Sequence, residues 1–142
     1  MSHTSLLFHC VFATKGRRPL IKDEIQTRLW AYMGGVAKTN AFKAIAVGGT
    51  RDHVHLLLSL PPTMPIAKAM QLIKAGSSKW MHESLGQSRF EWQEKYGAFT
   101  LGISQKATTV RYIQNQKKHH AKMDSAQEWK KILERHGLNA EE

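Results

Sequence analysis

Residues 51–60 read Arg-Asp-His-Val-His-Leu-Leu-Leu-Ser-Leu, and this stretch decides which fold we expect. Its side chains alternate as they do in a β-strand, which places Val54, Leu56, Leu58 and Leu60 on one face and His53, His55, Leu57 and Ser59 on the other. The aliphatic face predicts a strand that packs on a hydrophobic core. The other face carries two imidazoles, two residues apart, which is close enough for them to share one divalent ion.

The histidine pair needs support from elsewhere in the chain. With 8 histidines among 142 residues, an H-x-H triplet is expected about 0.4 times by chance, so the triplet alone is not specific. The strand context strengthens it, because an apolar strand has no packing need for two neighbouring imidazoles. Asp52 would point away from His53 on an ideal strand, so we expect it to orient a neighbour or the hairpin rather than to bind a metal.

Around this strand the sequence predicts an alternation of strands and helices. Strands are expected over 5–14, 42–48 and 99–103, and helices from about 22 to 39, from Pro65 onward, from about 107 to 122 and from Asp124 or Ser125. A turn at Gly48, Gly49 and Thr50 makes a hairpin with the histidine strand. The order predicts an α+β fold, a ferredoxin-like split βαβ (βαββαβ) with a mainly antiparallel four-stranded sheet and additional C-terminal helices.

Length and charge narrow the function classes. At 142 residues we expect one domain over 1–142, and 21 Lys and Arg against 11 Asp and Glu give a net charge of +10. Such a balance favours a polyanionic partner, usually nucleic acid, over a generally basic protein without one. The single Cys10 excludes an internal disulfide, and no apolar run approaches the length of a membrane span. We therefore expect a cytoplasmic protein with no membrane contact.

Two groups of polar residues are candidate DNA contacts. Lys15, Arg17 and Arg18 form a basic turn after the first strand, which could hold phosphates or be an ordinary solvated loop. Lys74 and Ser78 follow one side of the second predicted helix, which could track a nucleic-acid backbone or simply face water. The loop up to Gly97 carries Phe90, Trp92 and Tyr96, which either pin it to the core or offer a surface for an unpaired base.

The predicted helix over 107–122 presents a second chemical feature. Tyr112 and Gln116 are four residues apart and share one face, with His119 close by, while Val110 and Ile113 lie on a different side and would be buried. A tyrosine turned away from the apolar face of its helix is not explained by packing, although an amphipathic surface tyrosine is the simple alternative.

Four segments together resemble the single-tyrosine HUH (His–hydrophobic–His) transposases, which include the insertion-sequence-200-like and the REP-associated tyrosine transposases. Residues 52–57 are similar to the HUH strand of that family, and 112–116 to its nucleophile helix. Residues 11–19 resemble its first strand and basic turn, and 90–99 the segment before its fourth strand. The resemblance covers roughly residues 5–120, in the right order and spacing.

The resemblance implies a DNA strand transferase. Tyr112 would attack a scissile phosphate in single-stranded DNA that carries hairpin or repeat structure, leaving a 5′-phosphotyrosine and a free 3′-OH. His53, His55 and Gln116 would hold one divalent ion, Mg²⁺ or Mn²⁺. Lys15, Arg17, Arg18, Lys74, Ser78 and His119 would be candidate DNA contacts. Members of the family are commonly homodimers, in which the tyrosine helix of one copy can serve the histidines of the other in trans.

Two other function classes compete with this interpretation. In a non-catalytic nucleic-acid-binding module with an RRM-like sheet, the histidines would stack or contact phosphate without catalysis, and such a sheet would want aromatics on its face in place of the paired histidines. A domesticated relative that binds repeats and cuts poorly would fall between that module and the transposase. A metal-dependent hydrolase would use His53, His55 and a third imidazole from 119 or 120, and would form no covalent protein–DNA adduct.

Overall fold

One antiparallel sheet organises the computed structural model, which describes residues 2–120 and 123–138. In these residues the strands are β1 (Leu7–Ala13), β2 (Lys43–Gly49), β3 (His53–Ser59) and β4 (Gly97–Leu101). Their spatial order is β2-β3-β1-β4, and each neighbouring pair is antiparallel. This order and the helices between the strands confirm the split βαβ fold predicted from the sequence.

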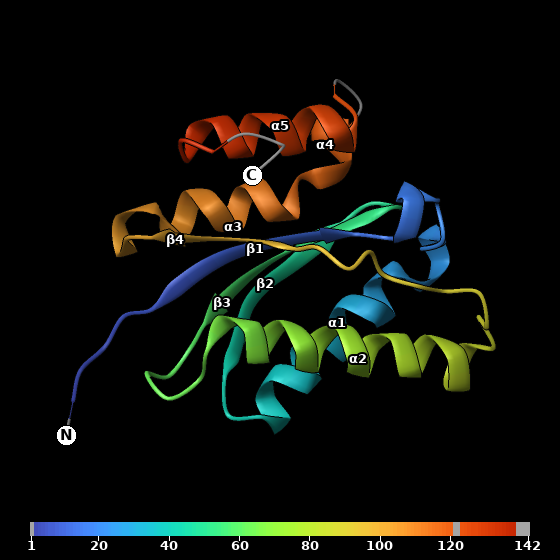
Figure 1. Ribbon diagram of the computed structural model, residues 1–142, viewed down its shortest axis with the longest axis horizontal. Helices are drawn as coiled ribbons and strands as arrows, with labels where there is room; N and C mark the ends of the chain where they lie inside the picture. Colours follow the sequence, from blue (N-terminus) through green and yellow to red (C-terminus); the bar gives the residue numbers. More distant parts are fainter. Residues whose placement is uncertain (1, 121–122, 139–142) are drawn as a thin grey trace.

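Helices cover both faces of the sheet (Figure 1). On one face lie α1 (Asp23–Thr39) and α2 (Ile66–Leu85), the helices of the two βαβ units. On the other lie α3 (Lys106–Gln114), α4 (Gln116–His120) and α5 (Ser125–Arg135). Short 3-10 turns, Lys15–Arg17 and Ile103–Gln105, follow β1 and precede α3. In the described part of the chain, no helix combines the length and the apolar character that crossing a bilayer requires.

The alternation predicted for β3 is confirmed. Val54, Leu56 and Leu58 join the main hydrophobic core with residues of α1 and α2, whereas Leu57 belongs to a second cluster with Ile113 of α3. Residues 53–58 are all buried. The histidine strand is therefore covered from both sides, and its two imidazoles lie in the layer between the sheet and the C-terminal helices.

The predicted helix over 107–122 is interrupted. Asn115 has φ −103° and ψ 24°, so α3 ends at Gln114 and α4 begins at Gln116. Residues 121–122, where we expected the helix to end, lie outside the described residues, as do the side chains of His119 and His120. The interruption comes between Tyr112 and Gln116, and the Gln116 side chain still donates to the Tyr112 carbonyl at 3.3 Å.

A glycine lets α3 approach the sheet. A Cβ at Gly48 would lie 2.4 Å from the carbonyl oxygen of Ile113, well inside contact distance. Because glycine has no side chain, the α3 backbone can lie directly on β2 at this point. This contact sets the height of Tyr112 and Gln116 above the histidine strand.

α5 is fixed by its cap and by its apolar face. The Asp124 side chain accepts from the Gln127 amide at 2.8 Å, as a helix N-cap does. Trp129 covers Gly97, where a Cβ would lie 2.6 Å from its ring. Ile132 and Leu133 pack with Val11 and Phe99 in a cluster of their own. The helix is thus docked on β1 and β4.

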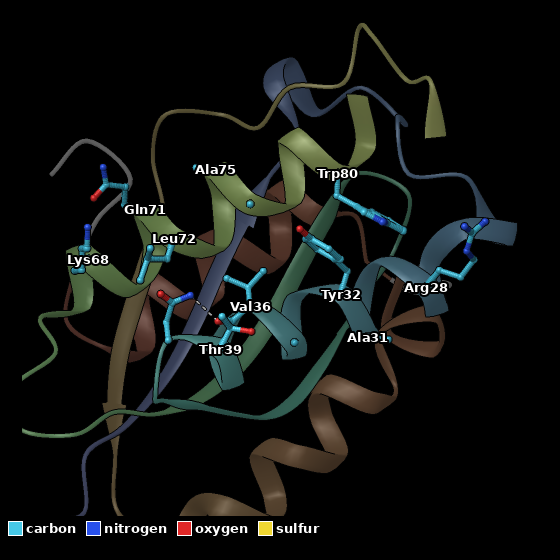
Figure 2. Close-up of a pocket in the computed structure, with 13 residues that line it drawn as sticks. Arg28, Ala31, Tyr32, Val36, Thr39, Lys68, Gln71, Leu72, Ala75 and Trp80 are labelled. Atoms are coloured by element: carbon cyan, nitrogen blue, oxygen red, sulfur yellow. Dashed lines mark hydrogen bonds between the residues drawn. The ribbon is translucent and has the colours of Figure 1, made fainter. Parts of the chain in front are cut away.

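A cavity of about 900 Å³ lies between α1 and α2, on the face away from the histidines (Figure 2). Tyr32 is half-buried there and stacks on Trp80 with ring centroids 5.0 Å apart. Arg28 lies over the Trp80 ring at 5.7 Å. None of the chemical features singled out on β3 or α3 lines this cavity.

Candidate active site

Four polar side chains converge on the buried face of β3; we call them the His–Gln–Glu cluster (His53, His55, Gln116 and Glu128). His53 Nε2 lies 3.0 Å from Gln116 Oε1 and 3.2 Å from Glu128 Oε1. His55 Nε2 lies 2.9 Å from the same Glu128 oxygen. All four residues are buried, although they come from three elements, β3, α4 and α5.

The spacing of these donors fits a small divalent cation. The ligand atoms of His53, His55 and Glu128 lie within 4.8 Å of one another. In an octahedral site with bonds of about 2.1 Å, adjacent ligands stand about 3.0 Å apart, which matches the separations in the cluster. Two imidazoles, an amide oxygen and a carboxylate oxygen are a mixed donor set for one divalent cation, in which the imidazoles suit transition metals and the oxygens suit Mg²⁺ or Mn²⁺.

Neighbouring groups orient both imidazoles for such binding. His53 Nδ1 lies 2.8 Å from Asp52 Oδ1 and 2.9 Å from the Thr50 hydroxyl. Because a carboxylate can only accept a hydrogen bond, His53 Nδ1 carries a proton. The other ring nitrogen, Nε2, faces the cluster. His55 Nε2 faces Glu128 Oε1 at 2.9 Å and donates to it, while His55 Nδ1 lies 2.8 Å from His9 Nε2. With His9 accepting there, His55 would keep a proton on Nδ1 when a cation replaces the proton on Nε2. Such outer contacts are typical of metal-binding histidines.

The surroundings shift the pKa values of His53, His9 and Glu128 in different directions. Burial alone would lower the pKa of His53, but its contacts with Asp52, Glu128 and Gln116 outweigh it and raise this pKa to about 9. Burial and the neighbouring His55 lower the pKa of His9 to about 3, which keeps His9 neutral and able to accept. Burial would raise the pKa of Glu128, and hydrogen bonds from both histidines reverse this and lower it. The cluster thus carries a carboxylate beside a histidine that holds a proton until a cation replaces it.

Tyr112 reaches the cluster within the same chain. Its hydroxyl donates to Glu128 Oε2, and its ring lies 5.5 Å from that of His55, edge to face. Burial and the hydrogen bond to Glu128 raise the pKa of the phenol. The structure therefore brings together Tyr112, Gln116, His53 and His55, the four residues singled out from the sequence, without a second copy of the chain.

Four of the residues predicted as DNA contacts have protein partners, and one of them, Arg17, lies close to the His–Gln–Glu cluster. Lys15 forms an exposed ion pair with Glu91 at 3.4 Å, and Arg17 donates to the Ser125 hydroxyl at 2.9 Å. The Arg18 Nε donates to the Lys15 carbonyl at 3.3 Å. Lys74 donates to the carbonyls of residues 93, 94 and 95, which fixes the loop before β4.

Ser78 lies half-buried on α2, and the His119 side chain is not described. For this whole group, DNA contact stays a prediction. In the loop, Phe90 and Trp92 are buried and pack edge to face, so they pin the loop to the core, whereas Tyr96 is exposed.

Sequence reasoning missed Glu128 and the role of His9. The signal for Glu128 was present in α5, because Ser125, Glu128 and Ile132 recur at spacings of three and four and all face inward. A carboxylate on the apolar face of a helix requires a buried partner. His9, on the neighbouring strand β1, contacts His55.

The fold and the cluster define a class of α+β proteins in which a central strand carries a histidine pair and a covering helix carries a tyrosine. The family model described as "Transposase IS200 like" matches residues 2–116, and the chain belongs to this family. Two relatives with similar sequences illustrate the low identity within the family.

The chain is 26% identical over 97 residues to the transposase for insertion sequence element IS200 of Salmonella typhimurium. This match spans 67% of the chain and 64% of the relative's length. It is 26% identical over 117 residues to the ISDra2 transposase TnpA of Deinococcus radiodurans, spanning 78% of the chain and 84% of that protein.

Solved structures share the fold. A Deinococcus radiodurans R1 crystal structure, described as a transposase, superposes with a TM-score of 0.67 at 26% identity, over 81% of this chain and 93% of that one. A REP-associated tyrosine transposase bound to a REP hairpin superposes with a TM-score of 0.57 at 17% identity, over 81% of this chain and 72% of that one. At that identity, the second likeness concerns the fold alone.

Proposed function

We propose that the protein is a transposase that cuts and rejoins single-stranded DNA through a 5′-phosphotyrosine intermediate formed on Tyr112. The observation that carries this proposal is the position of the Tyr112 hydroxyl beside the His–Gln–Glu cluster within one chain. The membership of the IS200-like family supports the same reaction class.

The residues that would hold a Mg²⁺ or Mn²⁺ ion are His53, His55 and Gln116, and the carboxylate of Glu128 fits the same site. Such an ion, when bound, neutralises charge that develops on the scissile phosphate and aligns it for in-line attack. Asp52 and His9 contact Nδ1 of the two imidazoles, so that Nε2 of each ring would be the atom that binds the ion in place of its present contacts with Gln116 and Glu128.

Tyr112 supplies the nucleophile. Its oxygen forms a bond to phosphorus, the bond from phosphorus to the 3′ oxygen breaks, and the phenolic proton is balanced by the proton that the 3′-OH gains. The phosphotyrosine keeps a phosphodiester, so attack by another 3′-OH reverses the step and joins two DNA strands. Gln116 donates to the Tyr112 carbonyl, which ties the nucleophile to a metal ligand across the α3–α4 interruption.

The DNA partner is proposed to be a single strand with hairpin or repeat structure. The net charge of +10 supports a polyanionic partner, and the REP-associated tyrosine transposase of like fold is bound to a REP hairpin. A homodimer is the assembly that the family resemblance implies. Because Tyr112 already lies at its own histidines, we propose that each subunit cuts in cis.

The two competing functions predict different arrangements. An RRM-like module needs an exposed sheet face, whereas in the described residues α1 and α2 cover one face and α3 to α5 the other. A hydrolase that uses a third imidazole would need His119 or His120 where Gln116 and Glu128 lie beside His53.

The test is a denaturing-gel assay with 5′- and 3′-labelled single-stranded DNA carrying hairpins from the gene's flanks, in Mg²⁺ or Mn²⁺. Wild type is expected to form a protein-linked band on the strand 3′ to the cut, and Tyr112→Phe to form none. The matched control is Tyr32→Phe, which loses a hydroxyl on the other side of the sheet. Cleavage without an adduct in Tyr112→Phe would favour the hydrolase, and binding without cleavage the non-catalytic module or a domesticated relative.

A further inference from the structure

We infer that Glu128 is a second catalytic residue, which holds the Tyr112 hydroxyl at the histidines and accepts its proton during attack. This inference rests on the proposed function of Tyr112 as the nucleophile. It assigns a chemical role to α5, which follows residues 2–116, the part of the chain matched by the family model.

The two carboxylate oxygens of Glu128 contact different groups. Oε1 lies 2.9 Å from His55 Nε2 and 3.2 Å from His53 Nε2, on the side where a cation fits. Oε2 accepts the hydrogen bond from Tyr112. One side chain therefore connects the nucleophile to the pair of imidazoles, and an acceptor in direct contact with the reacting oxygen satisfies the first requirement of a general base.

The position of this carboxylate is determined by packing. Glu128 is 4% exposed, and the residues on either side of it are anchored. Ser125 accepts from Arg17 at 2.9 Å and donates to Asp52 Oδ2 at 3.3 Å, while Trp129 covers Gly97. Burying this charge costs stability, and its contacts with the two imidazoles and the phenol offset that cost, so the carboxylate is held at the Tyr112 oxygen.

The step balances without another reactant. The proton moves from the Tyr112 oxygen to Glu128 Oε2 as the bond from that oxygen to phosphorus forms. The bond to the 3′ oxygen breaks on the opposite side of the phosphorus, where the leaving oxygen takes up a proton from solvent and becomes the free 3′-OH, and Glu128 returns its proton to solvent, so that no net reactant is consumed. Glu128 ends the step as a carboxylate, ready for the reverse reaction.

The experiment compares Glu128→Gln with wild type and with Glu134→Gln, the same change at an exposed position of the same helix. Single-turnover adduct formation is measured at saturating Mn²⁺, with Mn²⁺ affinity measured separately by electron paramagnetic resonance. We expect Glu128→Gln to form the adduct on the order of 100-fold more slowly, and Glu134→Gln to match wild type. Glu128→Asp keeps a carboxylate on a shorter arm and is expected to fall between them.

A second readout separates proton transfer from a structural role. Replacing Tyr112 with 3,5-difluorotyrosine gives a more acidic phenol that depends less on a base. We expect this replacement to speed adduct formation in Glu128→Gln by about 10-fold or more and to leave the rate in the Glu128 protein unchanged or lower. A slow Glu128→Gln variant that the fluorinated phenol does not rescue would overturn the role of proton acceptor.

The outcomes distinguish this inference from the function on which it rests. If wild type forms the adduct and Glu128→Gln forms it within about 3-fold of the same rate at saturating Mn²⁺, Glu128 is not catalytic and the proposed function stands. If wild type forms no adduct while binding Mn²⁺ and DNA, the proposed function fails and the inference fails with it.

Discussion

At the scale of single residues, each imidazole of the pair is oriented by a different kind of partner. His53 donates to the carboxylate that precedes it, whereas His55 contacts another imidazole from the neighbouring strand. Asp52 thus orients a neighbour, as we expected from strand parity. It does so because the residue comes before β3 begins, where the chain has left the ideal alternation of the strand.

Asp52→Asn is expected to weaken metal binding. The amide can present its NH₂ group to His53 Nδ1, which favours the tautomer with the proton on Nε2 and so blocks the metal-binding position. We expect Mn²⁺ affinity to fall about 10- to 100-fold in a titration calorimeter. Asp23→Asn, which removes an exposed carboxylate paired with Arg51, is the matched control and should bind as wild type does. Equal affinities in the two variants would contradict this role of Asp52.

His9 makes the metal-free protein sensitive to acid. The pKa of His9 is about 3 in the folded protein, below its ordinary value of 6.5. Below pH 6.5, His9 therefore binds a proton in the unfolded chain but stays neutral in the folded protein. The free energy of unfolding should therefore fall as pH drops from 6.5 to 5, by at most about 1.4 kcal/mol per pH unit from this group. Urea denaturation in EDTA measures it.

His9→Gln should flatten that slope, because glutamine does not titrate. The exposed His3→Gln is the control and should keep the wild-type slope. His53 leaves this window unaffected, because its folded pKa of about 9 is raised, so its stabilising contribution is complete below pH 6.5 and is lost only as pH rises toward 9. An unchanged slope in His9→Gln would show that the acid sensitivity has another origin.

At the scale of elements, the contact between α3 and β2 controls the site. α3 carries Tyr112 and leads directly into Gln116, and its backbone rests on Gly48. The interruption at Asn115 changes the direction of the chain between these two residues. The side chains of Tyr112, near the end of α3, and Gln116, at the start of α4, both reach the face of β3 that carries the histidines.

Gly48→Ala is expected to move α3 away from the sheet. The added methyl would lie 2.4 Å from the Ile113 carbonyl oxygen, a backbone atom that cannot rotate aside. Such overpacking costs about 1–3 kcal/mol of stability. We expect adduct formation to fall at least 10-fold under conditions where the variant remains folded, because nucleophile and ligand shift together.

Gly102→Ala adds the same methyl where no atom lies within 4 Å, and it should have neither effect. Thermal denaturation followed by circular dichroism gives the stability, and the denaturing gel gives the adduct. A Gly48→Ala protein as stable and as active as Gly102→Ala would show that the close approach of α3 is not needed.

At the scale of the whole molecule, the site is complete in one chain. β3, α3, α4 and α5 of a single copy supply every member of the cluster and the tyrosine. This arrangement predicts the outcome of mixing two inactive variants, because a subunit that lacks either the histidine or the tyrosine cannot be repaired by its partner if catalysis is in cis.

We expect a mixture of His53→Ala and Tyr112→Phe proteins to stay inactive. The two are co-expressed with different affinity tags and purified through both, so that any dimer contains one of each, and adduct formation is measured on the denaturing gel. Mixtures of wild type with either variant serve as controls for activity of a single intact subunit. Adduct formation by the doubly purified pair would mean that the tyrosine helix acts in trans.

The sequence alone determined the antiparallel sheet, the histidine pair on β3 and the pairing of Tyr112 with Gln116. The alternation in β3 and the spacing of Tyr112 and Gln116 depend on local periodicity, which the chain carries without reference to its fold. Only the tertiary structure brought in Glu128 and His9. Glu128 lies 73 residues from His55, and His9 lies 46 residues from it, so their contacts exist only after α5 docks and β1 pairs with β3. A buried charge is selected by the partners that surround it in space, and local sequence patterns do not contain that information.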